Sequence, residues 1–170
     1  MARPGGGKNK AAKTYARYLY ERNLDEVTEV LDLATISSKI RGASVGELFH
    51  LLDPIETEDI VIDYLQSKGW HVVKSSASRG QPKIECVLRR VDDEPESGFV
   101  QVKSGNATIA EEEYAELAND STVYLHQRYP PTSTSHNGIE WIRPEELKTY
   151  LQNQPGYLPE HTLLKLGLAL

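Results

Sequence analysis

The sequence predicts an α/β fold in which a mixed sheet is flanked by helices in two or three layers. Helix-capping patterns precede segments with apolar residues at helical spacing. Short runs rich in β-branched and aromatic residues lie between those segments. A polar segment over 92–98 joins two such runs directly, whereas helical segments separate others, so hairpins and crossovers are both expected. With 170 residues, 39% of them hydrophobic, the chain is long enough to bury one core.

The N-terminal part differs in charge from the rest of the chain. Its first 22 residues carry six Lys and Arg side chains and one acid, so they contribute +5 to a net charge of −6 and leave −11 for the rest. Apolar residues recur at helical spacing from Tyr15 to Leu31. We predict a basic arm with one or two helices over residues 1–43. A phosphate-binding role and a solubilising role account for it equally well.

Two helices are predicted next. Ser44 and Glu47 form a capping box before an apolar segment that ends near Leu52. Pro54 suits the first position of a second helix, which Gly69 ends.

The remaining elements alternate between strands and helices. In chain order they are a strand over 70–75, a loop over 78–82, a strand over 84–91, a hairpin loop over 92–98, a strand over 99–103, a helix from a capping box at Thr108–Glu111 to about residue 118, a strand over 122–126, a loop over 129–138, a strand over 139–142, a helix over 144–152 and a short helix within 159–170. We assign residues 44–153 to the main domain and 154–170 to a C-terminal tail that packs on its core.

Composition excludes several classes of protein. A net charge of −6 is not that of a histone-like basic binder, although a local basic surface is compatible with it. The single cysteine, Cys86, excludes an internal disulfide framework and a Cys-rich zinc module. Apolar runs stay well short of the ~20 residues of a membrane span, and the first residues lack the apolar stretch of a signal peptide. We therefore expect a cytoplasmic protein with no membrane association.

One carboxylate falls on the apolar side of the second helix. The apolar stripe runs through Ile55, Ile62 and Leu65, with Val61 and Tyr64 beside it. Glu58 lies on this stripe by spacing, whereas Glu56, Asp59 and Asp63 fall off it. A carboxylate that points inward needs a cation or hydrogen-bond donors. A position at the rim of the core, with Glu58 capping a neighbouring backbone group, is the structural alternative.

Polar side chains also share one face of the predicted hairpin. Glu85 alternates with Cys86, which we expect to be a small buried hydrophobe on the opposite face. Gln101 and Lys103 are two residues apart and face the same way. If the hairpin brings Glu85 beside Gln101, the three polar side chains cluster. A solvated strand face with a cross-strand Glu–Lys pair is the simpler alternative.

This ordered set resembles the PD-(D/E)xK nuclease superfamily, and within it the Mrr-type restriction endonuclease branch, whose last motif is Gln-x-Lys. The resemblance rests on Glu58 in the helix before the first strand, on Glu85 in the second strand and on Gln101-Val102-Lys103 in the third strand. It covers residues 56–127 approximately. It implies a restriction-endonuclease-like core of order αβββαβ and a metal-dependent DNA endonuclease that hydrolyses phosphodiester bonds.

The resemblance also implies a role for each residue. Glu85 and the Val102 carbonyl would bind Mg²⁺, with Mn²⁺ as an alternative, and Glu58 would bind it directly or through water. Gln101 would offer its amide to the ion or to a water. Lys103 would lie beside the attacking water and the scissile phosphate. The predicted catalytic residues are thus Glu58, Glu85, Gln101 and Lys103.

Contacts to DNA have to come from local basic or small residues, because the body of the chain is acidic. We predict them at Lys74, Arg79, Lys83 and Ser104, although an ordinary charged turn explains the three cations equally well. Cutting both strands of a duplex asks for two copies of the site, so a homodimer is our working hypothesis.

Two other classes of function stay open. In the first, the same fold is a non-catalytic module that binds nucleic acid or protein. In the other, Glu58, Glu85 and Lys103 form only a buried ion-pair network within a small α/β protein.

Overall fold

The computed structural model of the chain describes residues 32–73, 84–90, 96–158 and 160–170. Its described part contains a five-stranded sheet in the order β1-β2-β3-β4-β5. The strands are β1 (His71–Val72), β2 (Cys86–Arg90), β3 (Glu96–Lys103), β4 (Thr122–Gln127) and β5 (Ile139–Trp141). β1, β2 and β3 pair antiparallel, whereas β4 runs parallel to both β3 and β5. The expected α/β fold with a mixed sheet is confirmed.

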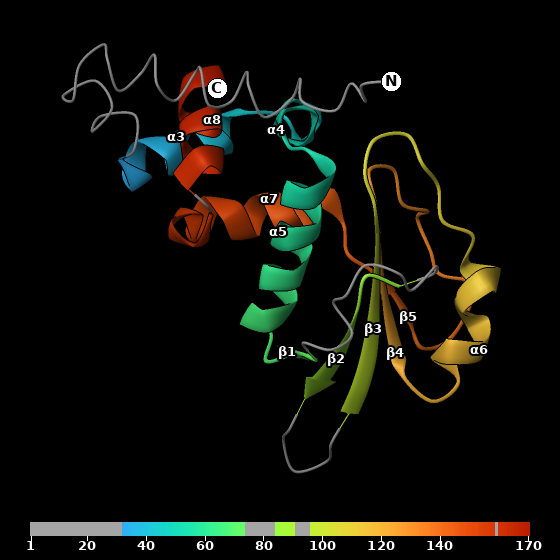
Figure 1. Cartoon of the computed structure of the whole chain (residues 1–170). Helices are drawn as coiled ribbons and strands as arrows, with labels where there is room; N and C mark the ends of the chain where they lie inside the picture. Colours follow the sequence, from blue (N-terminus) through green and yellow to red (C-terminus); the bar gives the residue numbers. More distant parts are fainter. Residues whose placement is uncertain (1–31, 74–83, 91–95, 159) are drawn as a thin grey trace, which may run out of the picture.

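Helices cover the two faces of the sheet unequally (Figure 1). The larger group comprises α3 (Leu33–Gly42), α4 (Val45–Leu51), α5 (Pro54–Ser67), α7 (Pro144–Asn153) and α8 (Glu160–Ala169), with the 3-10 segment η3 (Pro155–Tyr157) between the last two. We call the sheet face beneath α5 the helical face; its buried strand residues include Cys86, Leu88, Val100 and Val102. The 3-10 helix η2 (Glu111–Tyr114) and α6 (Ala115–Ala118) cover the opposite face, which we call the α6 face.

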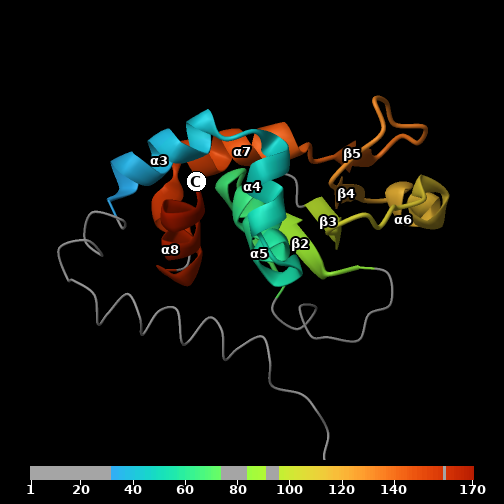
Figure 2. The ribbon, with the colours of Figure 1, turned by 90° about the horizontal axis from the view of Figure 1, so that it is seen from above.

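The helical face carries the larger core. Figure 2 shows α3 and α8 on the side of α5 that is away from the strands, so the helices themselves form a thick layer. Ile36 of α3, Val61 of α5 and Leu166 of α8 are all fully buried in this layer. The basic arm over residues 1–31 lies outside the described residues, but α3 joins the core through α7 and α8. None of the described helices is long and apolar enough to cross a lipid bilayer.

Local signals set the starts and ends of α4 and α5. The Ser44 side chain accepts from Glu47 N (3.1 Å), and the Glu47 carboxylate accepts from Ser44 N (2.7 Å). A second capping box, with Asp53 at the N-cap, opens α5 and places Pro54 in its first turn. Gly69 ends that helix with φ +90°, a conformation that favours glycine. Both helix predictions are confirmed.

Two strands differ in extent from the prediction. β1 comprises only His71–Val72 before residues 74–83, which are not described and include the expected loop over 78–82. β3 begins at Glu96, so residues 96–98 belong to a strand and were wrongly predicted as loop. Gly98 pairs with Leu88 beneath the Trp70 ring, where a Cβ would lie 3.1 Å from a ring carbon. From the sequence, Gly98 resembles a turn residue. In the structure, the close contact with the Trp70 ring is what favours glycine at this strand position.

The predicted capping box at Thr108–Glu111 does not form. The 3-10 helix η2 begins after Ala110, which makes no side-chain cap, and α6 then runs only from Ala115 to Ala118. Glu111 is 6% exposed, and its carboxylate accepts hydrogen bonds from Ser135 and Trp141 instead. These long-range donors replace the local cap.

The rotation of α5 also differs from the prediction. Ile55, predicted on the apolar stripe, is 56% exposed, whereas Glu56, predicted off it, is 5% exposed. The Glu56 carboxylate accepts from Thr162 Oγ1 (2.9 Å) and Lys165 Nζ (2.6 Å), both on α8. The C-terminal helix therefore supplies the donors that allow a carboxylate to be buried here.

Candidate active site

Glu85 and Gln101 meet on adjacent strands, as the hairpin pattern predicts. Glu85 directly precedes β2, and its backbone N–H donates to the Val100 carbonyl (2.8 Å). Gln101 on β3 is 3% exposed, and its Nε2 donates to Glu85 Oε1 (2.8 Å) and to the Val102 carbonyl (3.1 Å). One amide nitrogen thus contacts two oxygen atoms, those of Glu85 and Val102, that the family resemblance implies as metal ligands.

Lys103 continues the same strand two residues beyond Gln101. Strand alternation places its half-buried side chain on the face of the sheet that Gln101 occupies. Ser104, also half-buried, follows directly. Gly105 then has φ +68° with open space where a Cβ would stand, so the chain turns at this end of β3 with its backbone accessible.

Glu58 lies over the other face of the sheet. It is half-buried in the second turn of α5, and α5 packs on the helical face through Ile60, Val61 and Leu65. A short turn connects α5 to β1, which is parallel to β3, so the start of α5 and the end of β3 lie at the same end of the sheet (Figure 1). The structure thus brings Glu85, Gln101 and the Val102 carbonyl into one group, with Glu58 on a helix of the opposite face.

The negative charge of Glu85 acts on two neighbouring groups, one in η2 and one in β2. Burial raises the pKa of Tyr114 in η2, and the negative charges of Glu113 and Glu85 raise it further. Burial likewise raises the pKa of the Cys86 thiol to about 11, with Glu85 adding to the effect. Cys86 is fully buried, so the prediction that it is a small buried hydrophobe is confirmed.

The possible metal ligands are oxygen atoms of three different kinds, and they are not a cluster of acidic side chains. Among the described residues, no group of three or more His, Cys, Asp or Glu side chains gathers in a way that could hold a metal ion. The group at Glu85 instead combines one carboxylate, one backbone carbonyl and one amide. Mg²⁺ in proteins commonly binds one or two carboxylates and keeps water or phosphate oxygen in its other positions, so these residues fit that ion.

The basic residues predicted to contact DNA cannot be placed. Lys74, Arg79 and Lys83 lie within residues 74–83, outside the described ranges. The arm over residues 1–31 is also outside them. Ser104 is the one predicted contact that the structure places, and it lies beside Lys103.

Arg128 and Tyr129 were missed by the sequence analysis, which treated residues 129–138 only as a loop. They directly follow β4, whose last residue, Gln127, pairs with Lys103 in parallel register. A basic–aromatic pair at the carboxyl end of a strand was the available signal, because ligands of α/β sheets commonly bind at that end. Because Gln127 pairs with Lys103, Arg128 and Tyr129 follow β4 at the same end of the sheet as Lys103.

Comparison with family models, with curated proteins and with solved structures finds no match to this chain.

Proposed function

We propose that this protein is a metal-dependent DNA endonuclease with a restriction-endonuclease-like core. The observation that carries the proposal is the position of the Gln101 amide nitrogen, 2.8 Å from Glu85 Oε1 and 3.1 Å from the Val102 carbonyl oxygen. Two acceptors converge there on one donor in a buried setting. The element order α5-β1-β2-β3-α6-β4, with its first three strands antiparallel and β4 parallel to β3, supports the proposed core.

Gln101 is suited to alternate between two states. Its NH₂ group satisfies both acceptors when it donates to them. Rotation of the amide by half a turn would put its carbonyl oxygen where the NH₂ group now lies, and three oxygens, from Gln101, Glu85 and Val102, would then face one another. Glu85, Gln101 and the Val102 carbonyl would hold Mg²⁺ or Mn²⁺ in this way. Glu58 lies on α5 over the other face of the sheet, so it would act on the ion only around the end of the sheet, through a bound water. The bound ion would supply an activated water and charge for the phosphate.

Lys103 supplies the fixed positive charge of the proposed mechanism. Its ammonium group, on the same strand face as Gln101, would bind the scissile phosphate and stabilise the negative charge that develops as water attacks phosphorus. Ser104 and the accessible turn at Gly105 would then contact the DNA backbone beside it. Lys74, Arg79 and Lys83 remain proposed phosphate contacts, and a homodimer would supply the second site that cutting of both strands requires.

The test is nicking of supercoiled plasmid DNA with Mg²⁺ or Mn²⁺. We expect wild type to cut and Lys103→Ala to lose at least ~100-fold in rate, as when a group that stabilises transition-state charge is removed. Lys68→Ala is the matched control, since Lys68 is an exposed lysine at the far end of α5. Glu85→Ala should abolish cutting as well, whereas Glu116→Ala, which removes an exposed carboxylate of α6, should not. Equal cutting by Lys103→Ala and wild type would refute the site.

A non-catalytic binding module is the second candidate. One observation favours it: Gln101 already donates hydrogen bonds directly to Glu85 and to the Val102 carbonyl. The two candidates differ in their response to metal. Thermal unfolding of a nuclease should shift upward with Mg²⁺ or Mn²⁺, and Glu85→Ala should remove that shift. DNA binding without any shift in melting temperature would favour the module.

A further inference from the structure

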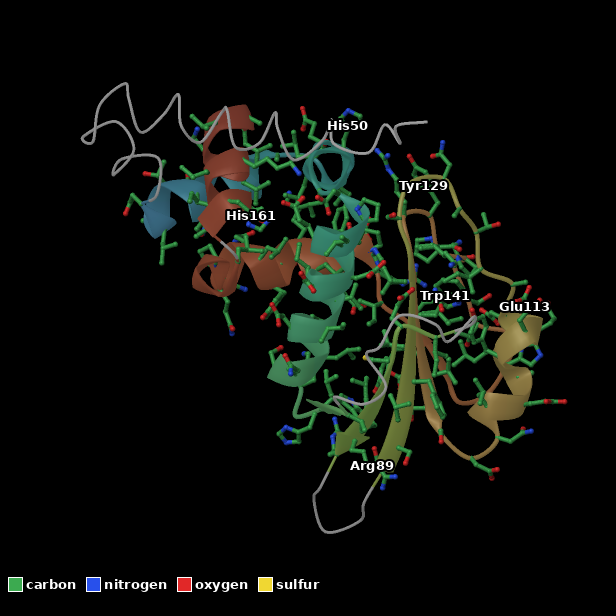
Figure 3. All side chains as sticks on the ribbon, in the orientation of Figure 1. His50, Arg89, Glu113, Tyr129, Trp141 and His161 are labelled. Carbon is green, nitrogen blue, oxygen red and sulfur yellow. The ribbon has the colours of Figure 1, made fainter. Side chains whose placement is uncertain are left out.

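Tyr129 is unusually exposed for an aromatic residue. Its relative exposure is 70%, and only two other large hydrophobic residues in the described ranges, Leu33 and Ile55, are exposed. Figure 3 shows Tyr129 at the end of the sheet near α4, away from the body of α6. An exposed aromatic ring at the carboxyl end of a strand is available for stacking contacts with a ligand.

The backbone beneath Tyr129 is fixed by a buried side chain. Gln127, 6% exposed, donates from Nε2 to the Tyr129 carbonyl (2.7 Å), and its Oε1 accepts from Ile109 N (2.7 Å). Gln127 also pairs with Lys103 along β4 and β3. The strand that carries the proposed catalytic lysine therefore lies directly beside the residue that positions Tyr129.

The rest of the loop is held in the same way by two other side chains. Arg143 donates to the carbonyls of Pro131 (3.2 Å) and Thr132 (3.0 Å), and Glu111 accepts from Ser135 N (2.7 Å). Such side-chain anchors limit the local motion of a loop. The exposure of Tyr129 is therefore a property of a fixed surface rather than of a loose segment.

Arg128 adds a cation to this surface. Its guanidinium carbon lies 5.5 Å from the centroid of the Tyr129 ring. Its Nη2 makes a long hydrogen bond to the Gly46 carbonyl (3.3 Å), and its buried Nε has no hydrogen-bond partner among the described residues. Nε is buried and cannot meet a ligand, but within the described ranges the guanidinium end of this half-buried side chain makes only the long bond to Gly46 and lies beside an aromatic face. A cation in this position is suited to a phosphate next to a base that stacks on the ring.

We infer that Arg128 and Tyr129 bind an unpaired nucleotide of the DNA strand that is cut. Tyr129 stacks on the base and Arg128 contacts a phosphate of the same strand. Only a base that is unstacked from a duplex offers its face to a side chain, so the preferred substrate is DNA with a single-stranded or unpaired segment next to the scissile phosphate. This inference rests on the proposed function, because it names the substrate of that site.

The test is binding of fluorescent oligonucleotides in EDTA, so that cutting is absent. We expect wild type to bind single-stranded DNA, or a duplex with an overhang, more tightly than a blunt duplex. Tyr129→Ala should weaken binding to single-stranded DNA about 10-fold or more, whereas Tyr129→Phe retains it. Ile55→Ala is the matched control, since it removes another exposed hydrophobic side chain and should change nothing.

Stacking itself is measured with Tyr129→Trp. Single-stranded DNA should quench the fluorescence of the new indole relative to wild type, whose Trp70 and Trp141 are buried. Unchanged affinity in Tyr129→Ala, absence of quenching in Tyr129→Trp, or preference for a blunt duplex overturns the inference.

The outcomes also separate this inference from the proposed nuclease activity. Metal-dependent cutting with unchanged binding by Tyr129→Ala would leave the nuclease and reject the stacking site. Loss of binding in Tyr129→Ala, with no cutting of any substrate by wild type, would leave the stacking site and reject the nuclease. Absence of DNA binding by wild type would reject both.

Discussion

The two faces of the sheet bury their residues in different ways. On the helical face, strand residues such as Leu88 and Val100 pack against several helices in a continuous apolar core. On the α6 face the apolar cluster is smaller, and Gln101, Glu111 and Gln127 are buried beside it. Each of these three has defined hydrogen-bond partners. The helical face therefore supplies most of the stability, and the α6 face can carry polar groups in fixed positions.

The largest effect on stability is expected on the helical face. Leu88 is fully buried there, so Leu88→Ala should leave a cavity and lower the free energy of unfolding by about 3 kcal/mol. Urea unfolding at pH 7 measures this loss. Leu33→Ala, at a position that is 43% exposed, should stay within about 0.5 kcal/mol of wild type. A loss below about 1 kcal/mol for Leu88→Ala would mean that the core on the helical face is too loosely packed to supply most of the stability.

A smaller effect, with a distinct pH dependence, is expected for Glu111 on the α6 face. Burial opposes ionisation of Glu111, but hydrogen bonds from Ser135 and Trp141 outweigh it and lower the pKa to about 2. A carboxyl whose pKa is lower in the folded state stabilises the protein above its unfolded pKa, near 4.3, and this contribution disappears as the pH falls to about 2. Glu111→Gln should therefore cost about 2 kcal/mol at pH 7 and progressively less between pH 4.3 and 2.

Unfolding curves measured from pH 7 to pH 2 test this expectation. Glu112→Gln is the matched control, because Glu112 is the exposed neighbour of Glu111 in η2 and should leave stability unchanged at every pH. A constant difference between Glu111→Gln and wild type over the whole range would show that the charge of Glu111 does not matter for stability.

Elements whose signals are local were predictable from the sequence. The helix starts at Ser44 and Asp53 depend on side chains three residues away, and the end at Gly69 depends on its own φ. The meeting of Glu85 and Gln101 was also predictable, because a hairpin brings adjacent strands together and side chains alternate along them.

Features set by distant partners were not predictable. Glu111 forms a plausible local capping box in the sequence, yet its donors lie 24 and 30 residues further along the chain. Glu56 is buried by donors of α8 that lie more than 100 residues away. The periodicity of α5 does not reveal which face of the sheet it covers either, so the placement of Glu58 opposite the Glu85 face required the structure.

The smallest effect is expected at Gln101, and it tests whether the α6 face holds a metal site. Gln101→Glu would set two carboxylates at hydrogen-bond distance and remove the donor that Glu85 uses. Without metal we expect a loss of about 1 kcal/mol from the repulsion. Mg²⁺ at ten times the variant's dissociation constant should return about 1.4 kcal/mol. The same concentration should stabilise wild type less, because the added charge strengthens binding in the variant. Gln127→Glu, at the other buried amide of this face, should be destabilised with no recovery in Mg²⁺. Equal responses of the two variants to Mg²⁺ would mean that the oxygens around Gln101 bind no metal ion and only form hydrogen bonds. The α6 face would then bury more polar groups than the helical face but would hold no metal site.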